Sequence, residues 1–374
     1  MSGDPSNDPQ EFMRACLQRI ATGPELSKDL SHDETRAAMR LILDGRADPV
    51  QAGVFLIALR MKRESDDENR GALRALIDSA VLATAAVDEV VDIADPYDGY
   101  ARTLPASPFL PAVLAACGLP AVSHGLESVG PKFGVTHRLV LGAAGIDVDS
   151  SVRQAAERAA DPNIGWAYVD QKSYCPKLHN LVSLRRLIVK RPCLSTVEVL
   201  VGPVRGRVRT HLFTGYVHQN YPRIYALLAR EAGFDSALIV RGVEGGVLPS
   251  LRQPAKIFYY RDRGEEASMT VDPLTLGIRA DSRTVPLPEN LGVSESTGAA
   301  ATPNTNALAD AAARSGLDAL NGIPGPMRES LVYSAALCLV HTRRHDSLEQ
   351  AAQAARTALD SGAARARFEA QRMP

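Results

Sequence analysis

Hydrophobic residues in the first third of the chain recur at helical spacing behind clear helix-start signals. Ser31 and Ser65 each stand three residues before a glutamate and directly ahead of an apolar-periodic run, which is the pattern of a capping box. The first of these helices is expected to end near Gly45, and Asp48-Pro49 opens another helix between the two. Three short helices with tight connections predict a small helical bundle.

After about residue 88 the pattern changes to short β-branched runs that alternate with alanine-rich helical stretches. Alternation of this kind predicts an α/β domain with a largely parallel sheet. Residues 281–304, rich in Pro, Ser, Thr and Gly, are expected to form a long surface loop, with helices after it at 327–341 and 347–359. The expected strands are 90–94, 121–122, 166–169, 197–201, 212–217, 237–240 and 257–260.

Length and composition narrow the class of protein. A chain of 374 residues favours two domains over one. Five scattered cysteines without a CxxC pair favour reduced thiols over disulfides or a zinc site. The polar, acidic start and the shortness of the apolar runs then predict a soluble, cytoplasmic protein with no membrane partner. Aromatic residues make up only 5% of the chain, which argues against an aromatic base-stacking surface.

Charge is unevenly distributed along the chain, although the formal net charge is only −1. Between Lys172 and Arg223 there are ten Lys and Arg residues and one acid, Glu198. Such a segment predicts a local positive surface that captures an anion, which could be a carboxylate, a phosphate or a nucleic-acid backbone. The alternative is an ordinary solvated face.

Three stretches resemble the anthranilate phosphoribosyltransferase family, which also includes the pyrimidine nucleoside phosphorylases. They are LSHDETRAAMRLILDGRADPVQAGVFLIALRMKRES near the start, GLPAVSHG in the middle and DSLEQAAQAARTALDSGAARARFEAQ near the end. The resemblance implies an all-helical domain beside an α/β domain, a cleft between them, and a homodimer formed through the helical domains. In the family, phosphoribosyl pyrophosphate (PRPP) binds in this cleft with magnesium, and anthranilate attacks the ribose C1.

The expected domain boundaries combine this resemblance with the pattern of elements. We expect the helical domain at 10–85, with a helical contribution from about 172–192. The α/β domain is expected at 86–171 and 193–374, interrupted by the long loop.

The family's glycine-rich phosphate loop is replaced here by Asp-Pro-Tyr-Asp at residues 95–98, and only Gly99 remains nearby. Proline lacks a backbone donor and carboxylates repel a pyrophosphate, so this loop is predicted to be a poor diphosphate cradle. Ser107 stands where the family has a serine. Asp95 and Asp98 are expected to lie in a turn, and a metal site built from them is the alternative.

The family's second motif, KHGNR, reads SHGLE in this chain. His124 and Gly125 match, while the lysine, the asparagine and the arginine are replaced. Lys132 restores one positive charge from a displaced position. His124 is either a cleft residue or a structural histidine at a strand end. The residues that the resemblance places at a ligand or phosphate are Asp98, Gly99, Ser107, His124, Gly125 and Lys132.

The Asp-Glu pair that holds magnesium in the family is replaced by Val247 and Leu248, with Glu244 as a single carboxylate nearby. Magnesium needs hard oxygen ligands, so these two aliphatic residues cannot hold it. A magnesium site remains possible only through Asp95 and Asp98, and no other cofactor is indicated.

The family's basic helix is the motif that is retained. The segment SLRRLIVKR keeps Arg185, Arg186 and Arg191. By resemblance, the second arginine of the pair contacts the anthranilate carboxylate. These three residues are therefore the candidate anion or acceptor site, and no catalytic residue is assigned.

Three functions remain open. The leading interpretation is a divergent phosphoribosyltransferase scaffold that binds a phosphorylated or anionic ligand in the cleft without efficient anthranilate turnover. The second is a nucleic-acid-binding homodimer. One branch of the family, which also lacks the PRPP-binding residues, is known to bind nucleic acid. The third is a true anthranilate phosphoribosyltransferase of tryptophan biosynthesis. The residues that resemble the nucleic-acid-binding branch are Pro96, Gly99, His124, Gly125, Gly242, Glu244 and Gly245.

Overall fold

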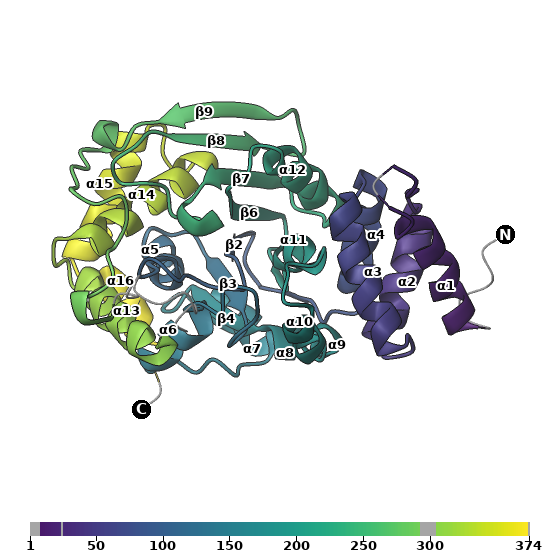
Figure 1. The fold of residues 1–374 in the computed structure, drawn as a ribbon. Coiled ribbons are helices and arrows are strands. Elements are labelled where there is room, and N and C mark those ends of the chain that lie inside the picture. The colour runs from purple at the N-terminus through teal and green to yellow at the C-terminus, as the bar shows by residue number, and fades with distance from the viewer. Residues whose placement is uncertain (1–7, 24, 292–303, 373–374) are drawn as a thin grey trace.

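The computed structural model describes residues 8–23, 25–291 and 304–372 of the chain. Figure 1 shows a bundle of helices at the N-terminal end and a larger domain in which helices cover both faces of a sheet. The protein therefore has the predicted combination of an all-helical domain and an α/β domain.

The α-helices are α1 (Pro9–Ile20), α2 (His32–Leu43), α3 (Pro49–Lys62), α4 (Asp66–Asp78), α5 (Leu110–Ala116), α6 (His137–Ala143), α7 (Val152–Ala160), α8 (Gln171–Tyr174), α9 (Pro176–His179), α10 (Val182–Ile188), α11 (Leu194–Val197), α12 (Tyr221–Glu231), α13 (Thr305–Leu320), α14 (Pro326–His341), α15 (Leu348–Asp360) and α16 (Ala363–Glu369). Short 3-10 helices span Ser107–Phe109, Glu198–Leu200, Val243–Gly245, Pro273–Leu276 and Glu289–Leu291. The strands are β1 (Ala83–Thr84), β2 (Glu89–Ala94), β3 (Ala121–Gly125), β4 (Trp166–Asp170), β5 (Val204–Arg205), β6 (Arg209–Tyr216), β7 (Ser236–Arg241), β8 (Ala255–Tyr260) and β9 (Ala267–Val271). Within the described residues, none of the helices combines the length and the apolar character needed to cross a bilayer.

Side-chain caps define where the helices of the bundle begin. The Ser31 hydroxyl accepts the N–H of Glu34, and the Ser65 hydroxyl accepts that of Glu68, both at 3.2 Å. Each glutamate reaches back to the backbone of its cap residue, which confirms the two predicted capping boxes. Asp48 caps α3. Helix α1, which is not among the helices predicted from these signals, packs its apolar face into the same core.

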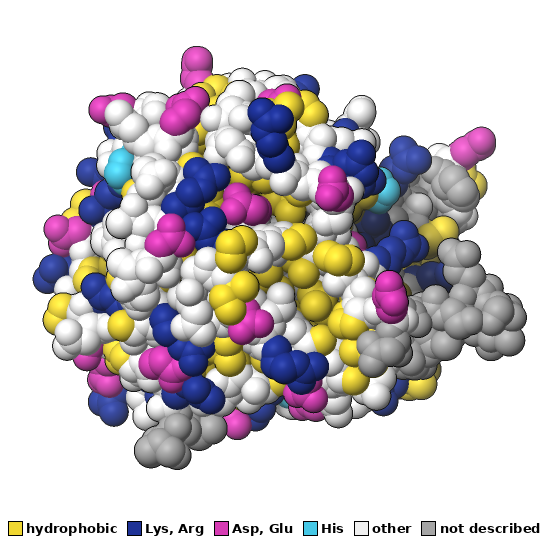
Figure 2. Space-filling model, turned by 90° about the vertical axis from the view of Figure 1, so that its left-hand side faces the viewer, with side chains coloured by type: hydrophobic (Ala, Val, Ile, Leu, Met, Phe, Trp, Pro, Cys, Tyr) yellow, Lys and Arg dark blue, Asp and Glu magenta, His cyan; other side chains and the backbone are white. Residues whose placement is uncertain are grey.

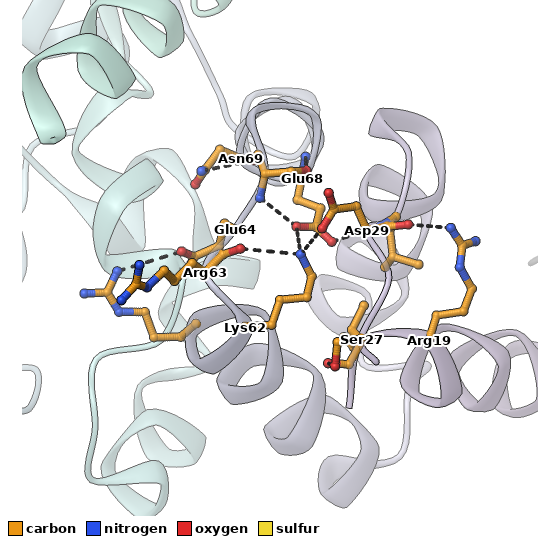
Figure 3. Close-up of polar contacts among 12 residues, drawn as sticks. Arg19, Ser27, Asp29, Lys62, Arg63, Glu64, Glu68 and Asn69 are labelled. Carbon is orange, nitrogen blue, oxygen red and sulfur yellow. Dashed lines mark hydrogen bonds and ion pairs between the residues drawn. The ribbon is translucent and has the colours of Figure 1, made fainter. Parts of the chain in front are cut away.

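A buried ion-pair cluster joins the helices of the bundle, as Figure 3 shows. Lys62, at the end of α3, places its Nζ 2.7 Å from Oε2 of Glu68 and also contacts Asp29. Glu68 is fully buried, and its Oε1 accepts the N–H of Leu30 at 2.9 Å. A buried carboxylate is costly unless it is paired and hydrogen-bonded. The cluster therefore fixes how α3 and α4 meet the connection between α1 and α2.

The sheet of the α/β domain has the strand order β4-β3-β2-β6-β7-β8-β9 in the part of the chain that is described. Strands β4, β3, β2, β6 and β7 are parallel, which confirms the predicted largely parallel sheet, and β8 and β9 join one edge antiparallel. The chain runs from β2 through β3 to β4 and then returns to the other side of β2 as β6. Ligands of open α/β sheets bind outside the carboxyl ends of the strands at such a switch point.

Both faces of the sheet are buried. Val91 and Phe213 contribute to a core under α5 and the C-terminal helices α13 to α16. Their neighbours Val90 and Leu212 belong to a second core, which continues into the helical bundle through Phe55 to Met13 of α1. Parallel strands covered on two sides are expected to be apolar at consecutive positions, as these are.

The short helices α8 to α10 lie against the bundle. Lys177 of α9 pairs with Asp44, just after α2, at 2.6 Å. A Cβ added to Gly53 on α3 would lie 3.8 Å from Leu184 of α10. This region therefore connects the bundle to the sheet domain.

One predicted strand is wrong. Residues 197–201 form the end of α11 and the 3-10 helix after it, not a strand. Val197, Val199 and Leu200 are all buried, and Glu198 turns inward to the buried Arg185. Tertiary packing of this apolar run overrides its β-branched composition. In the long loop predicted at 281–304, residues 292–303 lie outside the described residues.

Candidate binding cleft between the two domains

A cleft of about 390 Å³ opens at the carboxyl ends of β2 and β6, where the strand order reverses. Ala94 ends β2 and Tyr216 ends β6, and both line the cleft. Arg60 of α3 also lines the cleft, so the bundle and the sheet domain both border it. Charged side chains from other segments complete its wall: Asp98, Arg102, Lys132, Arg191, Glu198 and Glu244.

Asp95, directly after β2, is buried and fully engaged. Its Oδ2 accepts from the Tyr100 hydroxyl and from His137 Nε2, both at 2.9 Å, and from the Ser107 hydroxyl, while its Oδ1 accepts the N–H of Val247 at 2.8 Å. Burial opposes ionisation of this carboxyl, but the His137, Ser107 and Val247 contacts outweigh it and hold its pKa below the ordinary value. Asp95 thus ties four segments together beneath the cleft. Ser107 is completely buried in this contact and lies outside the cleft lining.

Asp98 lies at the cleft and is neutralised by two cations. Lys132 Nζ is 3.3 Å from Asp98 Oδ1, and Arg191 contacts Oδ2. Gly99 has a φ of +72°, and a Cβ there would come within 2.6 Å of the Val135 carbonyl oxygen. The structure therefore brings the predicted residues Asp98, Lys132 and Arg191 together and keeps a glycine beside them for steric reasons.

The Glu244 carboxylate is bound by the loop that follows β2. The carboxylate accepts the N–H of Ala101 at 3.0 Å and that of Arg102 at 2.9 Å, and the Thr103 hydroxyl at 3.2 Å. Lys132 Nζ lies 3.8 Å from Oε2 and donates to the Glu244 carbonyl oxygen at 3.3 Å. The loop after β2 is thus an oxyanion-binding loop that is filled by a side chain of the protein. Sequence reasoning identified Glu244 as a remnant of the metal motif and as a residue resembling the nucleic-acid-binding branch, and did not predict that its carboxylate fills this loop.

His124 and Gly125 do not line the cleft. His124 is buried, with Nε2 2.7 Å from Asp92 Oδ1 and Nδ1 2.5 Å from the Tyr97 hydroxyl. The Tyr97 hydroxyl also bonds that of Tyr174. Of this buried chain, Tyr97 is the member that lines the cleft. The geometry matches the structural-histidine alternative, in which His124 supports the cleft floor from below.

The three predicted arginines have different surroundings. Arg185 is buried and bonded twice to Glu198, at 2.6 Å each. Arg186 is exposed, lies outside the cleft lining and stacks 5.8 Å from the centre of the Phe133 ring. Arg191 lines the cleft. Arg191 lies after the end of α10, so the retained basic segment contributes one side chain to the cleft wall from outside its helix.

The basic segment is largely neutralised by acids from elsewhere in the chain. Within the described residues, seven of its ten cations meet a carboxylate. On the face drawn in Figure 2, basic and acidic side chains are likewise interspersed. The predicted concentration of positive charge is therefore wrong for most of this segment. The pairs are Lys172–Asp149, Lys177–Asp44, Arg185–Glu198, Arg191–Asp98, Arg207–Asp88, Arg209–Glu89 and Arg223–Asp66.

The residues at the cleft do not fit a magnesium pair. Val247 and Leu248 are buried apolar side chains. Asp95 has its oxygens filled by donors, and Asp98 and Glu244 are each held by cations or amides. In the residues that the structure describes, no group of three or more His, Cys, Asp or Glu side chains is placed to hold a metal.

Aromatic side chains in the cleft were missed by sequence reasoning. Tyr97, Tyr216, Tyr221 and Tyr225 all line it. The Tyr221 and Tyr225 rings are 5.6 Å apart, and Arg60 donates to the Tyr221 hydroxyl at 2.7 Å across the two domains. Three of the four tyrosines lie within residues 216–225, so this local concentration was visible in the sequence although the overall aromatic content is low.

Comparison with known proteins agrees with this architecture. Residues 14–80 match the helical bundle domain of a glycosyl transferase family, and residues 98–365 match its a/b domain. The chain is 28% identical over 351 residues to an anthranilate phosphoribosyltransferase from Sphingopyxis alaskensis, covering 94% of this chain and 97% of that protein. It is also 28% identical over 358 residues to the enzyme of the same name from Paramagnetospirillum magneticum, covering 95% and 94%.

Solved structures show the same fold. The anthranilate phosphoribosyltransferase from Thermus thermophilus has a TM-score of 0.71 at 19% identity, with 96% of this chain and 98% of that chain covered. The enzyme from Saccharomyces cerevisiae in complex with PRPP and Mg has a TM-score of 0.72 at 16% identity, with 96% of each chain covered. The chain therefore belongs to the glycosyl transferase family whose two domain models it matches. Within that family its relatives named above are anthranilate phosphoribosyltransferases, which confirms the family predicted from the sequence.

Proposed function

We propose that the cleft binds a small anionic ligand carrying a phosphate or a carboxylate, and that this divergent member of the family does not turn over anthranilate efficiently. The observation that carries the proposal is that the cleft wall already binds one oxyanion, the carboxylate of Glu244. The Glu244 carboxylate is held by two loop N–H groups and a hydroxyl, with Lys132 beside it. Groups arranged in this way bind carboxylates and phosphates alike.

The charges around the opening also favour an anion. Glu198 is neutralised from beneath by the buried Arg185, so cations exceed the remaining acids. The Arg102 guanidinium is exposed and makes no ion pair within the described residues, and the Arg191 side chain is 44% exposed. The lining cations are Arg60, Arg102, Lys132 and Arg191, and the lining acids are Asp98, Glu198 and Glu244.

The residues around the cleft do not provide the metal ligands that a phosphoribosyl transfer uses. A metal ion assists such a reaction by neutralising charge on the departing pyrophosphate. The relative from Saccharomyces cerevisiae was solved with PRPP and Mg, whereas here Val247 and Leu248 offer no oxygen ligand. The carboxylates nearby are already bonded to donors of the protein. This supports weak turnover at most.

A turnover assay tests this part of the proposal. Purified protein is incubated with anthranilate, PRPP and magnesium, and loss of anthranilate fluorescence is followed beside an active anthranilate phosphoribosyltransferase. We expect a rate at least about a thousandfold below that of the reference enzyme, which corresponds to roughly 4 kcal/mol of lost transition-state stabilisation. A rate comparable with the reference would contradict the proposal and establish the third interpretation, an enzyme of tryptophan biosynthesis.

We also propose a homodimer formed through the helical domain. Val50 and Met61 of α3 are 73% and 76% exposed, and Leu187 of the adjoining α10 is 80% exposed. Helix α10 packs against α3, and contiguous exposed apolar side chains mark interaction surfaces. Light scattering should give a dimer for the wild type and a monomer for Leu187→Asp. The control is Val208→Asp, at a residue that is 61% exposed on the sheet domain and should leave the dimer intact.

Free thiols support a reducing, cytoplasmic location for the protein. All five cysteines are free, and four of them are buried. Burial raises the pKa of the Cys16 thiol to about 12 and that of Cys117 to about 11, so neither forms a reactive thiolate near neutral pH. Fluorescence microscopy of a tagged chain together with a compartment marker tests the location.

Nucleic-acid binding is the alternative function. Its support is Arg186 and Lys190, which are exposed and make no ion pair within the described part of the chain. The neutralisation of most other cations in this segment weighs against it. A gel shift with single- and double-stranded DNA over a salt series tests this alternative, because binding through phosphate contacts weakens steeply as the salt concentration rises. Salt-sensitive binding that Arg186→Glu abolishes would favour the alternative, and no binding at low salt would remove it.

A further inference from the structure

We propose that Glu244 is an internal substitute for the anionic group of the ligand, and that a phosphate or carboxylate binds in the cleft by displacing this side chain. The inference rests on the function proposed above and identifies the residue that controls the same site. It follows from three features: the donors that hold the carboxylate, the place of Glu244 in the cleft wall, and the rigidity of the loop that carries it.

The donors around Glu244 would serve an external oxyanion equally well. Ala101 and Arg102 present two successive backbone N–H groups, at 3.0 Å and 2.9 Å from different oxygens of one carboxylate. Thr103 adds a hydroxyl donor at 3.2 Å, and the Lys132 ammonium lies 3.8 Å away. Successive N–H groups with a nearby cation form a concave anion site. None of these donors requires the anion to belong to the protein.

Glu244 lies in the wall of the cleft and not in the core. Its side chain is 10% exposed and borders the cavity of about 390 Å³. Rotation about its side-chain bonds therefore moves the carboxylate into open space. The residue also has a φ of +52°, in the left-handed region that glutamate rarely adopts. Backbone strain of this kind persists where surrounding packing enforces it, and it is concentrated at ligand sites and switches.

The loop itself is held in place, so the movement is confined to the side chain. A Cβ on Gly246 would come within 1.7 Å of the Tyr100 hydroxyl, and one on Gly242 within 1.5 Å of the Gly246 carbonyl oxygen. Backbone this closely packed cannot shift without breaking the surrounding contacts. The oxyanion site would therefore be preformed, and Glu244 would compete with the ligand for it.

This competition predicts a specific pattern of anion affinities. Isothermal titration calorimetry with inorganic pyrophosphate, at low ionic strength and without a divalent cation, compares the wild type with Glu244→Gly and Glu244→Gln. Glycine accepts the left-handed backbone and opens the site. Glutamine keeps one carbonyl oxygen on the amides but removes the charge. We expect Glu244→Gly to bind pyrophosphate at least tenfold more tightly than the wild type, which is about 1.4 kcal/mol, with Glu244→Gln between them.

The control is Glu265→Gly, at an exposed glutamate on the far edge of the sheet that should leave the affinity unchanged. Circular dichroism and melting temperature show that each variant is folded. If the wild type binds pyrophosphate and Glu244→Gly binds it no more tightly, the displacement mechanism is wrong while the proposed function stands. If neither the wild type nor either Glu244 variant binds any pyrophosphate, the proposed function fails together with this inference.

Discussion

Arg185 and Glu198 form a two-point ion pair directly beneath the cleft, with both nitrogen–oxygen distances at 2.6 Å. Their side chains are only 1% and 2% exposed. The pair holds α10 against the 3-10 helix that follows α11. Arg185 was expected to contact a ligand, but it stabilises the structure beneath the cleft instead.

Removing one partner of this pair should destabilise the protein strongly. Arg185→Met leaves the Glu198 carboxylate buried without a counter-charge, which costs about 3–5 kcal/mol. Urea unfolding measures the loss of free energy of unfolding. The matched control is Arg207→Met, whose pair with Asp88 is 58% and 72% exposed and should contribute less than about 1 kcal/mol. Equal effects of the two substitutions would contradict the assigned role of Arg185.

Replacing Gly246 tests the tight packing between the cleft loops. A Cβ at this position would lie 1.7 Å from the Tyr100 hydroxyl and 2.8 Å from Asp95 Oδ1. Gly246→Ala should therefore lower the free energy of unfolding by about 1–3 kcal/mol, as overpacking does. Gly142→Ala is the control, because nothing lies within 4 Å of its added methyl group and alanine favours the helix α6. A melting temperature for Gly246→Ala as high as that of the control would show that the loop is not packed as described.

Stability should fall as the pH is lowered because of two buried histidines. The Ser236 hydroxyl lies 2.6 Å from His211 Nδ1 and 2.9 Å from His341 Nε2. Burial lowers the pKa of both imidazoles, that of His341 well below the ordinary value, where nearby His211 and Arg261 contribute further. The unfolded chain, with histidine pKa values of about 6.5, then binds more protons than the folded protein. The stabilisation is complete above about pH 6.5 and is lost progressively below it.

Urea unfolding at pH 7.5 and 5.5 measures this dependence. Titration of carboxylates adds a background, so His341→Gln is compared with the wild type over the same interval. The variant should lose less stability between the two pH values than the wild type does. An identical loss in both proteins would rule out a contribution from His341.

The fold was largely predictable because its signals are local. Ser31 and Ser65 mark the starts of their helices through contacts with residues three positions away. The apolar runs of the strands can be recognised without knowing which strands pair with one another. The error at 197–201 has a tertiary cause. Glu198 is drawn inward by Arg185, thirteen residues earlier, and this contact has no signature in the order of residues.

The cleft was less predictable because its contacts join distant segments. Glu244 bonds Ala101 and Arg102 across 143 and 142 residues of sequence, and a missing glycine motif does not reveal that a side chain fills the loop. Ser107 matched a family position, but its hydroxyl bonds Asp95 in the core. The ten cations between Lys172 and Arg223 indicated an anion site, yet their carboxylate partners come from segments that only folding brings to them.

The effect of magnesium on PRPP affinity tests the central claim most directly. The claim is that the cleft provides an oxyanion site, whereas its carboxylates are already bonded to cations and amides of the protein and do not hold a divalent cation. Isothermal titration calorimetry of the wild type with PRPP, in EDTA and then in 5 mM MgCl2 at matched ionic strength, gives two dissociation constants. We predict that they agree within about threefold, which is less than 1 kcal/mol. A tenfold or greater gain in affinity with magnesium would contradict the claim.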